Sequence, residues 1–119
     1  MSRPLTANEV AQQMLKFSRE LGDVTARLDQ ADREAVNARE DYTLAYAREF
    51  LQADGSMEVR KQVAIERTHE QRLRAESADL VVRGLRRQID TLKTRIEVGR
   101  SHGAAIKAEM AFAGSGVAT

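Results

Sequence analysis

The stretch that decides the fold is residues 82–96, with the sequence VRGLRRQIDTLKTRI. Apolar residues recur in it at alternating steps of three and four, and charged or polar residues fill most positions between them. This heptad spacing is typical of a helix that buries one narrow seam, as the helices of coiled coils do. The seam keeps its phase in both directions and comprises Ala64, Thr68, Gln71, Ala75, Ala78, Val82, Leu85, Ile89, Leu92, Ile96, Gly99, Gly103, Ile106 and Met110. The sequence therefore predicts a helix of about 57–98.

A second seam of the same kind fills the N-terminal half of the chain. It comprises Val10, Met14, Phe17, Leu21, Val24, Leu28, Ala31, Ala35, Ala38, Tyr42 and Ala45. Thr6 and Glu9 precede it in a capping-box pattern, in which the threonine hydroxyl accepts a backbone N–H and the glutamate reaches back. We therefore predict a helix of about 7–53.

A tight turn separates the two predicted helices at residues 54–56, Asp-Gly-Ser. Gly55 can adopt the left-handed conformation that ends a helix, and Ser56 can cap the next one. Two helices of nearly equal length joined in this way favour an all-α fold, a long antiparallel helical hairpin that resembles a coiled coil.

The C-terminal part of the chain carries two glycines, Gly99 and Gly103, four residues apart on the seam. This spacing permits either a close helix crossing or a kink followed by a short helix of about 104–112. We predict the kink, a single helical domain over residues 1–113, and a flexible tail over 114–119. Because many apolar residues lie outside both seams, we also expect the chain to form oligomers.

The composition argues against several classes of protein. The 119 residues include no cysteine, so neither disulfides nor thiolate chemistry are expected. No apolar run follows Met1 or approaches the ~20 residues that cross a bilayer, so we expect a cytoplasmic protein with no membrane contact. His69 and His102 lie far apart with no further ligands at metal spacing, and no catalytic motif is present. We expect a protein that is not an enzyme and binds no metal or cofactor.

Positive charge gathers in the second half of the chain. Residues 83–107 carry seven Lys and Arg against two acids, although the net charge of the whole chain is only +1. Four of these cations, Arg86, Lys93, Arg100 and Lys107, lie seven residues apart and therefore line one helix edge at steps of about 10 Å. The edge could bind a polyanion such as nucleic acid, with Arg83, Arg87 and Arg95 widening it. It could equally pair with acids on a neighbouring helix.

Three aromatic residues, Tyr42, Tyr46 and Phe50, lie four residues apart before the turn. Bases of single-stranded nucleic acid stack on such rings. Aromatic residues at helical spacing are more often packing residues, so both interpretations stay open at this point.

Two short stretches resemble the UvsY-type recombination mediators of bacteriophages. Residues 37–42, Asn-Ala-Arg-Glu-Asp-Tyr, are similar to the family's Lys-Ala-Arg segment followed by Asp-Tyr. Residues 101–107, Ser-His-Gly-Ala-Ala-Ile-Lys, lead to Ala111-Phe112 and are similar to its Ser-Arg-Gly segment, Ala-Ile-Lys core and closing Ala-Phe. The chain departs from the family at Asn37, which replaces a lysine, and at His102, which replaces an arginine. The spacing from Lys107 to Phe112 is also shorter.

The resemblance implies a protein of phage-infected host cytoplasm that binds single-stranded DNA and forms a ring-like oligomer through its C-terminal helices. Such a mediator helps a RecA-type recombinase replace single-strand-binding protein, and Arg39 matches an arginine associated with DNA contact. The expected DNA-binding residues are Arg39, Arg83, Arg86, Arg87, Lys93, Arg95, Arg100 and Lys107. The expected oligomerisation residues are Leu85, Ile89, Leu92, Ile96, Gly99, Gly103, Ile106, Met110 and Phe112. The alternative function is that of a coiled-coil adaptor or scaffold that binds a protein partner.

Overall fold

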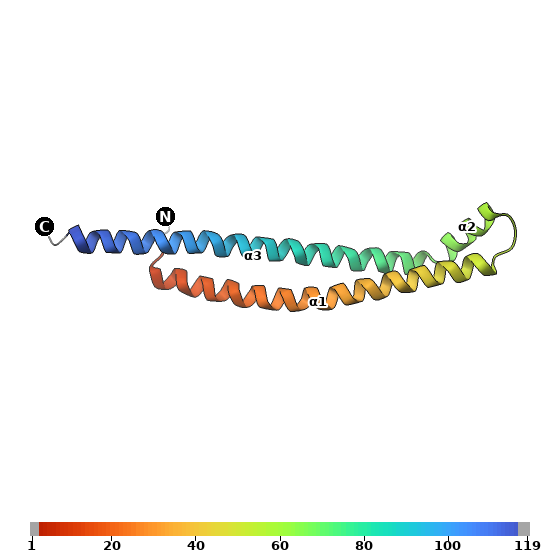
Figure 1. The fold of residues 1–119 in the computed structure, drawn as a ribbon, viewed down its shortest axis with the longest axis horizontal. Coiled ribbons are helices and arrows are strands. Elements are labelled where there is room, and N and C mark those ends of the chain that lie inside the picture. Colours follow the sequence, from red (N-terminus) through yellow and green to blue (C-terminus); the bar gives the residue numbers. More distant parts are fainter. Residues whose placement is uncertain (1–2, 117–119) are drawn as a thin grey trace. The chain divides into compact units, whose positions relative to one another are not determined.

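The computed structural model describes residues 3–116, which form three helices and no strand. These are α1 (Ala7–Gln52), α2 (Met57–Arg67) and α3 (His69–Gly116) (Figure 1). The prediction of an all-α chain is confirmed. Within the described range, none of the three helices has an apolar stretch long enough to span a bilayer.

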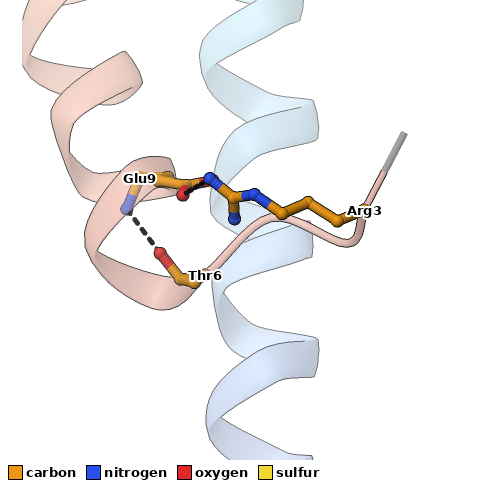
Figure 2. A network of polar contacts seen from close by, with 3 residues as sticks. All are labelled: Arg3, Thr6 and Glu9. Carbon is orange, nitrogen blue, oxygen red and sulfur yellow. Dashed lines mark hydrogen bonds and ion pairs between the residues drawn. The ribbon is translucent and has the colours of Figure 1, made fainter. Parts of the chain in front are cut away.

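The start of α1 is fixed by the predicted cap in altered form. The Thr6 hydroxyl accepts a hydrogen bond from the Glu9 backbone N–H at 3.2 Å, as expected. The Glu9 carboxylate does not complete the capping box but forms an ion pair with the Arg3 guanidinium (Figure 2). An acid in the first turn also interacts favourably with the positive end of the helix dipole.

The turn after α1 lies where the sequence predicts it. Gly55 has a φ of 108°, the left-handed region that a side chain would strain. Ser56 caps α2 and its hydroxyl accepts a hydrogen bond from the Val59 N–H at 3.3 Å. The chain therefore reverses over residues 53–56, and the predicted boundaries of both flanking helices agree with the structure to about one residue.

The predicted helix of 57–98 is wrong at Thr68, which separates α2 from α3. The Thr68 side chain is buried, and its hydroxyl donates to the Ala64 carbonyl at 2.6 Å while its backbone N–H donates to the same oxygen at 3.1 Å. A threonine hydroxyl that bonds to the carbonyl four residues back can bend a helix, although the same bond from the exposed Thr25 to the Leu21 carbonyl leaves α1 unbroken. Because Thr68 occupies a seam position, this bond forms inside the protein, where no water competes for the hydroxyl.

The predicted short helix of 104–112 is also wrong as a separate element, because α3 runs without a break through both glycines to Gly116. Each glycine costs the helix roughly 1 kcal/mol relative to alanine. The lost propensity is offset by packing, since the Met14 side chain occupies the space in which a Gly99 side chain would lie. Of the predicted tail, residues 114–116 belong to α3 and residues 117–119 lie outside the described range.

The chain divides into two compact units. Unit 1 contains the described residues up to Thr25 and from Arg87 onward, and unit 2 contains residues 26–86.

In both units α1 and α3 are antiparallel (Figure 1). In unit 1, Val10 is the neighbour of Gly103, Met14 of Gly99, and Phe17 of Arg95. In unit 2, ion pairs join Asp32 of α1 to Arg86 of α3 and Arg39 of α1 to Asp79 of α3, while Glu49 of α1 pairs with Arg67 of α2. Numbers rise along one helix as they fall along the other, so the predicted antiparallel pairing is present within each unit.

The two units bury different kinds of side chain. Unit 1 buries branched residues, namely Val10, Val24, Ile89, Leu92 and Ile96. The buried core of unit 2 is mostly alanine: Ala31, Ala35, Ala38, Ala53, Ala64 and Ala75, with Val82 and Leu85 at one end. Small side chains allow two helices to approach closely. Every predicted seam position is buried or half-buried except Met110.

Candidate nucleic-acid interface

All eight predicted DNA-binding side chains are exposed. The structure does not bring them into one cluster but divides them between the units. Unit 2 contains Arg39, Arg83 and Arg86, whereas unit 1 contains Arg87, Lys93, Arg95, Arg100 and Lys107. The two sets differ in how their charges are paired.

In unit 2 the three arginines lie along a groove of about 300 Å³ whose lining includes two acids, Asp32 and Asp79. Arg86 Nη2 lies 3.6 Å from Asp32 Oδ1 across the helix pair, and Arg39 Nε lies 3.9 Å from Asp79 Oδ1. Arg86 of the basic edge therefore pairs with an acid on the neighbouring helix, which is one of the two interpretations of that edge. These pairs are exposed and long, with 62% and 58% of the two arginine side chains accessible, so each contributes little to stability.

These acids were missed by the sequence analysis, although the sequence contains a signal for them. Asp32 and Arg39 lie seven residues apart on α1, and Asp79 and Arg86 lie seven residues apart on α3. When two such acid–base repeats run antiparallel on facing edges, each acid meets the arginine of the other helix. Finding the pairs required the register between the helices, which the predicted seams leave undetermined.

In unit 1 the cations of α3 are less neutralised. Lys93 and Lys107 have no carboxylate within 4 Å among residues 3–116, and neither does Arg87. Arg100 pairs with Glu97 of its own helix at 3.0 Å. Exposed lysines without an acid partner are the groups that a phosphate can approach at the least cost.

Arg95 differs from the other cations of unit 1. Its guanidinium lies over the Phe17 ring, 5.9 Å from the ring centroid, in a cation–π contact. Residues two positions apart do not share a helix face, so Arg95 cannot widen the edge on which Lys93 lies. Its more evident role is to pack across the two helices.

One row of α1 positions in unit 1 carries no charge, although α1 has charged residues on its other faces. A groove of about 340 Å³ brings Ala11 together with Arg100 and Lys107, and its other lining residues, all uncharged, are Ala7, Val10, Met14, Gly99, Gly103 and Ala104. The α1 positions that follow Ala11 at steps of seven are Ser18 and Thr25, which also carry no charge. No acidic row therefore faces Lys93, Arg100 and Lys107 within unit 1.

The net charges of the units agree with this difference in pairing. Unit 1 carries eight Lys and Arg against six Asp and Glu, a net charge of +2. Unit 2 carries 11 against 12, a net charge of −1. An anionic ligand is attracted to net positive charge, so unit 1 is the electrostatically favoured place for it.

The aromatic residues of α1 form a row in unit 2. Tyr42 and Tyr46 meet edge to face, with ring centroids 6.4 Å apart and planes at 76°. Tyr46 and Phe50 are stacked, again with centroids 6.4 Å apart but with planes at 16°. All three side chains are half-buried, so the rings pack on one another while part of each stays at the surface.

Four of the nine predicted oligomerisation residues, Leu85, Ile89, Leu92 and Ile96, are buried within one copy of the chain. Gly99, Gly103 and Ile106 are half-buried, whereas Met110 and Phe112 are 63% and 79% exposed. The first four are covered because the seam of α3 is used for packing inside the chain. A second copy could not reach them unless the helices separated.

A comparison of the chain with models of protein families, with curated proteins and with solved structures finds no match to any of them. The resemblance to the UvsY-type mediators therefore rests on the two short motifs at residues 37–42 and 101–112.

Proposed function

We propose that this chain binds single-stranded DNA, without sequence specificity, along the edge of α3 that carries Lys93, Arg100 and Lys107. The observation that supports the proposal most strongly is that both lysines are exposed without a carboxylate partner among the described residues, and that the row of α1 positions Ala11, Ser18 and Thr25 carries no charge. Steps of seven residues separate these cations by about 10 Å along the helix, so one strand could meet them at phosphates that are not immediate neighbours. Phosphate contacts carry no sequence information, so any strand would bind.

The arginines of unit 2 have a second, conditional part in this proposal. A phosphate would displace Asp79 from Arg39 and Asp32 from Arg86. These ion pairs are long and exposed, so breaking them costs little free energy. Arg83 lines the same groove and has no such pair among the described residues.

The biological role that we propose is recombination mediation, in which the protein helps a RecA-type recombinase replace single-strand-binding protein in the cytoplasm of the host cell. The support for this role is the resemblance of residues 37–42 and 101–112 to the UvsY-type family. A mediator must hold DNA and release it again, and weak contacts to phosphate satisfy both needs. Such a protein performs no chemistry of its own.

We also propose that copies of the chain associate, which would multiply weak DNA sites into useful affinity. Because the seams are buried, association has to use apolar side chains that point outward. Those of α3 in unit 2 include Leu73, Leu80 and Val81, each about half exposed. Leu73 and Leu80 lie seven residues apart and therefore share a helix face.

The proposed DNA contact is tested by neutralising the two unpaired lysines together, Lys93→Gln with Lys107→Gln. For single strands the logarithm of affinity falls with the logarithm of salt concentration at about −0.7 per phosphate neutralised. We expect the double variant to bind an oligonucleotide more weakly at low salt and to reduce that slope by about 1.4. Fluorescence anisotropy of a labelled oligonucleotide over a salt series measures both quantities.

The matched control is Lys16→Gln with Lys61→Gln, which changes the net charge equally at exposed positions off this edge. The control should keep nearly the full slope. If both pairs of substitutions weaken binding equally, the affinity comes from net charge alone and the proposed edge is wrong.

A protein-binding adaptor or scaffold is the second candidate. The observation that favours it is the pairing of Arg39 and Arg86 with acids of the same chain, which makes part of the basic edge structural. An adaptor would show no binding to single-stranded DNA even at low salt, where a DNA-binding protein binds most tightly.

A further inference from the structure

The aromatic row of α1 lies on the same helix face as Arg39. Arg39, Tyr42, Tyr46 and Phe50 follow one another at steps of three, four and four residues, which is the spacing of neighbours along one helix face. All four belong to unit 2. A cation and a row of rings are thus placed in line on one surface.

Packing of the helix pair does not require all of these rings. Tyr42 occupies a seam position, but the seam then continues at Ala45, so Tyr46 and Phe50 lie beside it rather than on it. Both are half-buried and rest on one another, with centroids 6.4 Å apart and planes at 16°. Two large aromatic side chains therefore stand at a partly exposed edge beside the seam.

The spacing of the rings follows the helix. Four residues rise about 6 Å along the helix axis, close to the 6.4 Å between successive ring centroids. The rings therefore form a row parallel to the helix, with the guanidinium of Arg39 before its first member. Proteins that bind single-stranded nucleic acid combine aromatic rings, on which bases stack, with cations that meet the backbone phosphates.

Arg39 has two partners that a phosphate could replace, because its Nε donates to the Ala35 carbonyl of its own helix at 3.3 Å and also lies near Asp79. Its contact with Asp79 is 3.9 Å long and lies at the surface, with 58% of the arginine side chain and 43% of the aspartate side chain accessible. Exposed pairs of this kind contribute little. If Arg39 contacted a phosphate, the base of the same strand could stack on the adjoining aromatic rings.

We propose that Tyr46 and Phe50, together with Tyr42 and Arg39, form a stacking platform for the unpaired bases of single-stranded nucleic acid. The proposal rests on the DNA binding proposed above. It adds a site for the bases, whereas Lys93, Arg100 and Lys107 contact only the backbone phosphates. Duplex DNA is excluded from this platform because its bases are already stacked and paired.

The composition of the chain provides a direct readout. Its two tyrosines, Tyr42 and Tyr46, both belong to the platform, and it contains no tryptophan. Tyrosine fluorescence of the unmodified protein therefore reports on this surface alone. We expect a thymidine oligonucleotide to quench it, and we expect neither an abasic oligonucleotide of the same length nor a duplex to do so.

The matched variants are Tyr46→Leu with Phe50→Leu, which keep apolar volume but remove the ring faces, and Leu44→Gln as a control on another face of α1. Stacking of one base contributes an amount that corresponds to about a 5-fold to 150-fold change in affinity. We expect the leucine variant to lose at least the lower value for the thymidine oligonucleotide and nothing for the abasic one. Circular dichroism verifies that its helicity is unchanged.

The outcomes separate the two proposals. Binding of the thymidine oligonucleotide without quenching, or equal affinity for the abasic one, would overturn the platform and leave the phosphate edge intact. Quenching by the abasic oligonucleotide would mean that a conformational change moves the tyrosines, which also overturns the platform. Binding of neither oligonucleotide at low salt would overturn both.

Discussion

At the scale of single residues, Gly99 lies inside a long helix because a neighbouring side chain fills the space that a larger residue would need. A Cβ added there would overlap the sulfur of Met14, whereas a Cβ added at Gly22 would meet nothing within 4 Å. Both glycines lie inside long helices and give up about the same helix propensity. Only at Gly99 does the missing side chain make room for another one.

These two glycines should respond differently to alanine. We expect Gly22→Ala to raise the free energy of unfolding by roughly 1 kcal/mol, because it gains propensity without a contact. Gly99→Ala should gain less or lose stability, since Met14 has to move. Thermal unfolding followed by circular dichroism compares the two directly.

The explanation is checked by repeating Gly99→Ala in a Met14→Ala background. There the alanine at position 99 should recover the gain seen at Gly22, so the two substitutions should be non-additive. Equal effects of Gly99→Ala in both backgrounds would show that Met14 is not the cause.

At the scale of elements, α2 and α3 are separate helices at Thr68, although the heptad seam runs through both without interruption. The heptad seam passes through Thr68 without a change of phase, so periodicity gives no warning of the break. The hydroxyl bonds to the Ala64 carbonyl where α2 ends, and the side chain stays buried at its seam position. A side chain can thus satisfy the seam and bend the helix at once.

Thr68→Val should straighten the junction of α2 and α3 while changing the free energy of unfolding by less than about 1.5 kcal/mol. The Ala64 carbonyl keeps the backbone N–H of residue 68 as a donor, so no buried acceptor is left unpaired. Spin labels on cysteines introduced at Glu58 and Glu76, in a chain without natural cysteine, would report the change. Their backbone separation should lengthen toward ~27 Å, the length of 18 residues of straight helix.

Thr68→Ser is the matched control, since it keeps the hydroxyl and removes the methyl group. Its label separation should remain that of the unsubstituted chain. A similar lengthening in the serine and valine variants would assign the bend to packing instead of to the hydrogen bond.

At the scale of the whole molecule, buried apolar residues of the seam and exposed apolar residues outside it are expected to differ in what their substitution changes. Seam residues such as Leu92 are buried inside one copy, while Leu73 and Leu80 are exposed. Leu92→Ala should therefore lower the free energy of unfolding by about 2–5 kcal/mol. Leu73→Gln with Leu80→Gln should leave helicity unchanged and lower the mass measured by sedimentation.

The opposite pattern would revise the proposed association. If the double glutamine variant keeps the mass of the unsubstituted protein, copies meet through another surface. If Leu92→Ala dissociates the protein while each copy keeps its stability, the α3 seam serves the contact between copies.

Much of this fold could be predicted from residue spacing. The two seams were identified because burial on one helix face forces a repeat of three and four, and Gly55 with Ser56 marked the turn because few other pairs satisfy that backbone. The break at Thr68 and the continuity through Gly99 could not be predicted, because each depends on one local contact that leaves the repeat unaltered. The pairing of Arg86 with Asp32 depends on the register between helices, which only the folded chain supplies.

The alanine core of unit 2 has a consequence for how its sequence can change over time. Ala35 and Ala38 are almost fully buried, so a larger side chain at either position would force the neighbouring helix away. Shrinking them to glycine or serine leaves the helices where they are. Substitutions that accumulate at the buried alanines of unit 2 should therefore not increase side-chain volume. Val24 and Ile89 of unit 1 can be replaced by apolar residues that are slightly smaller or slightly larger.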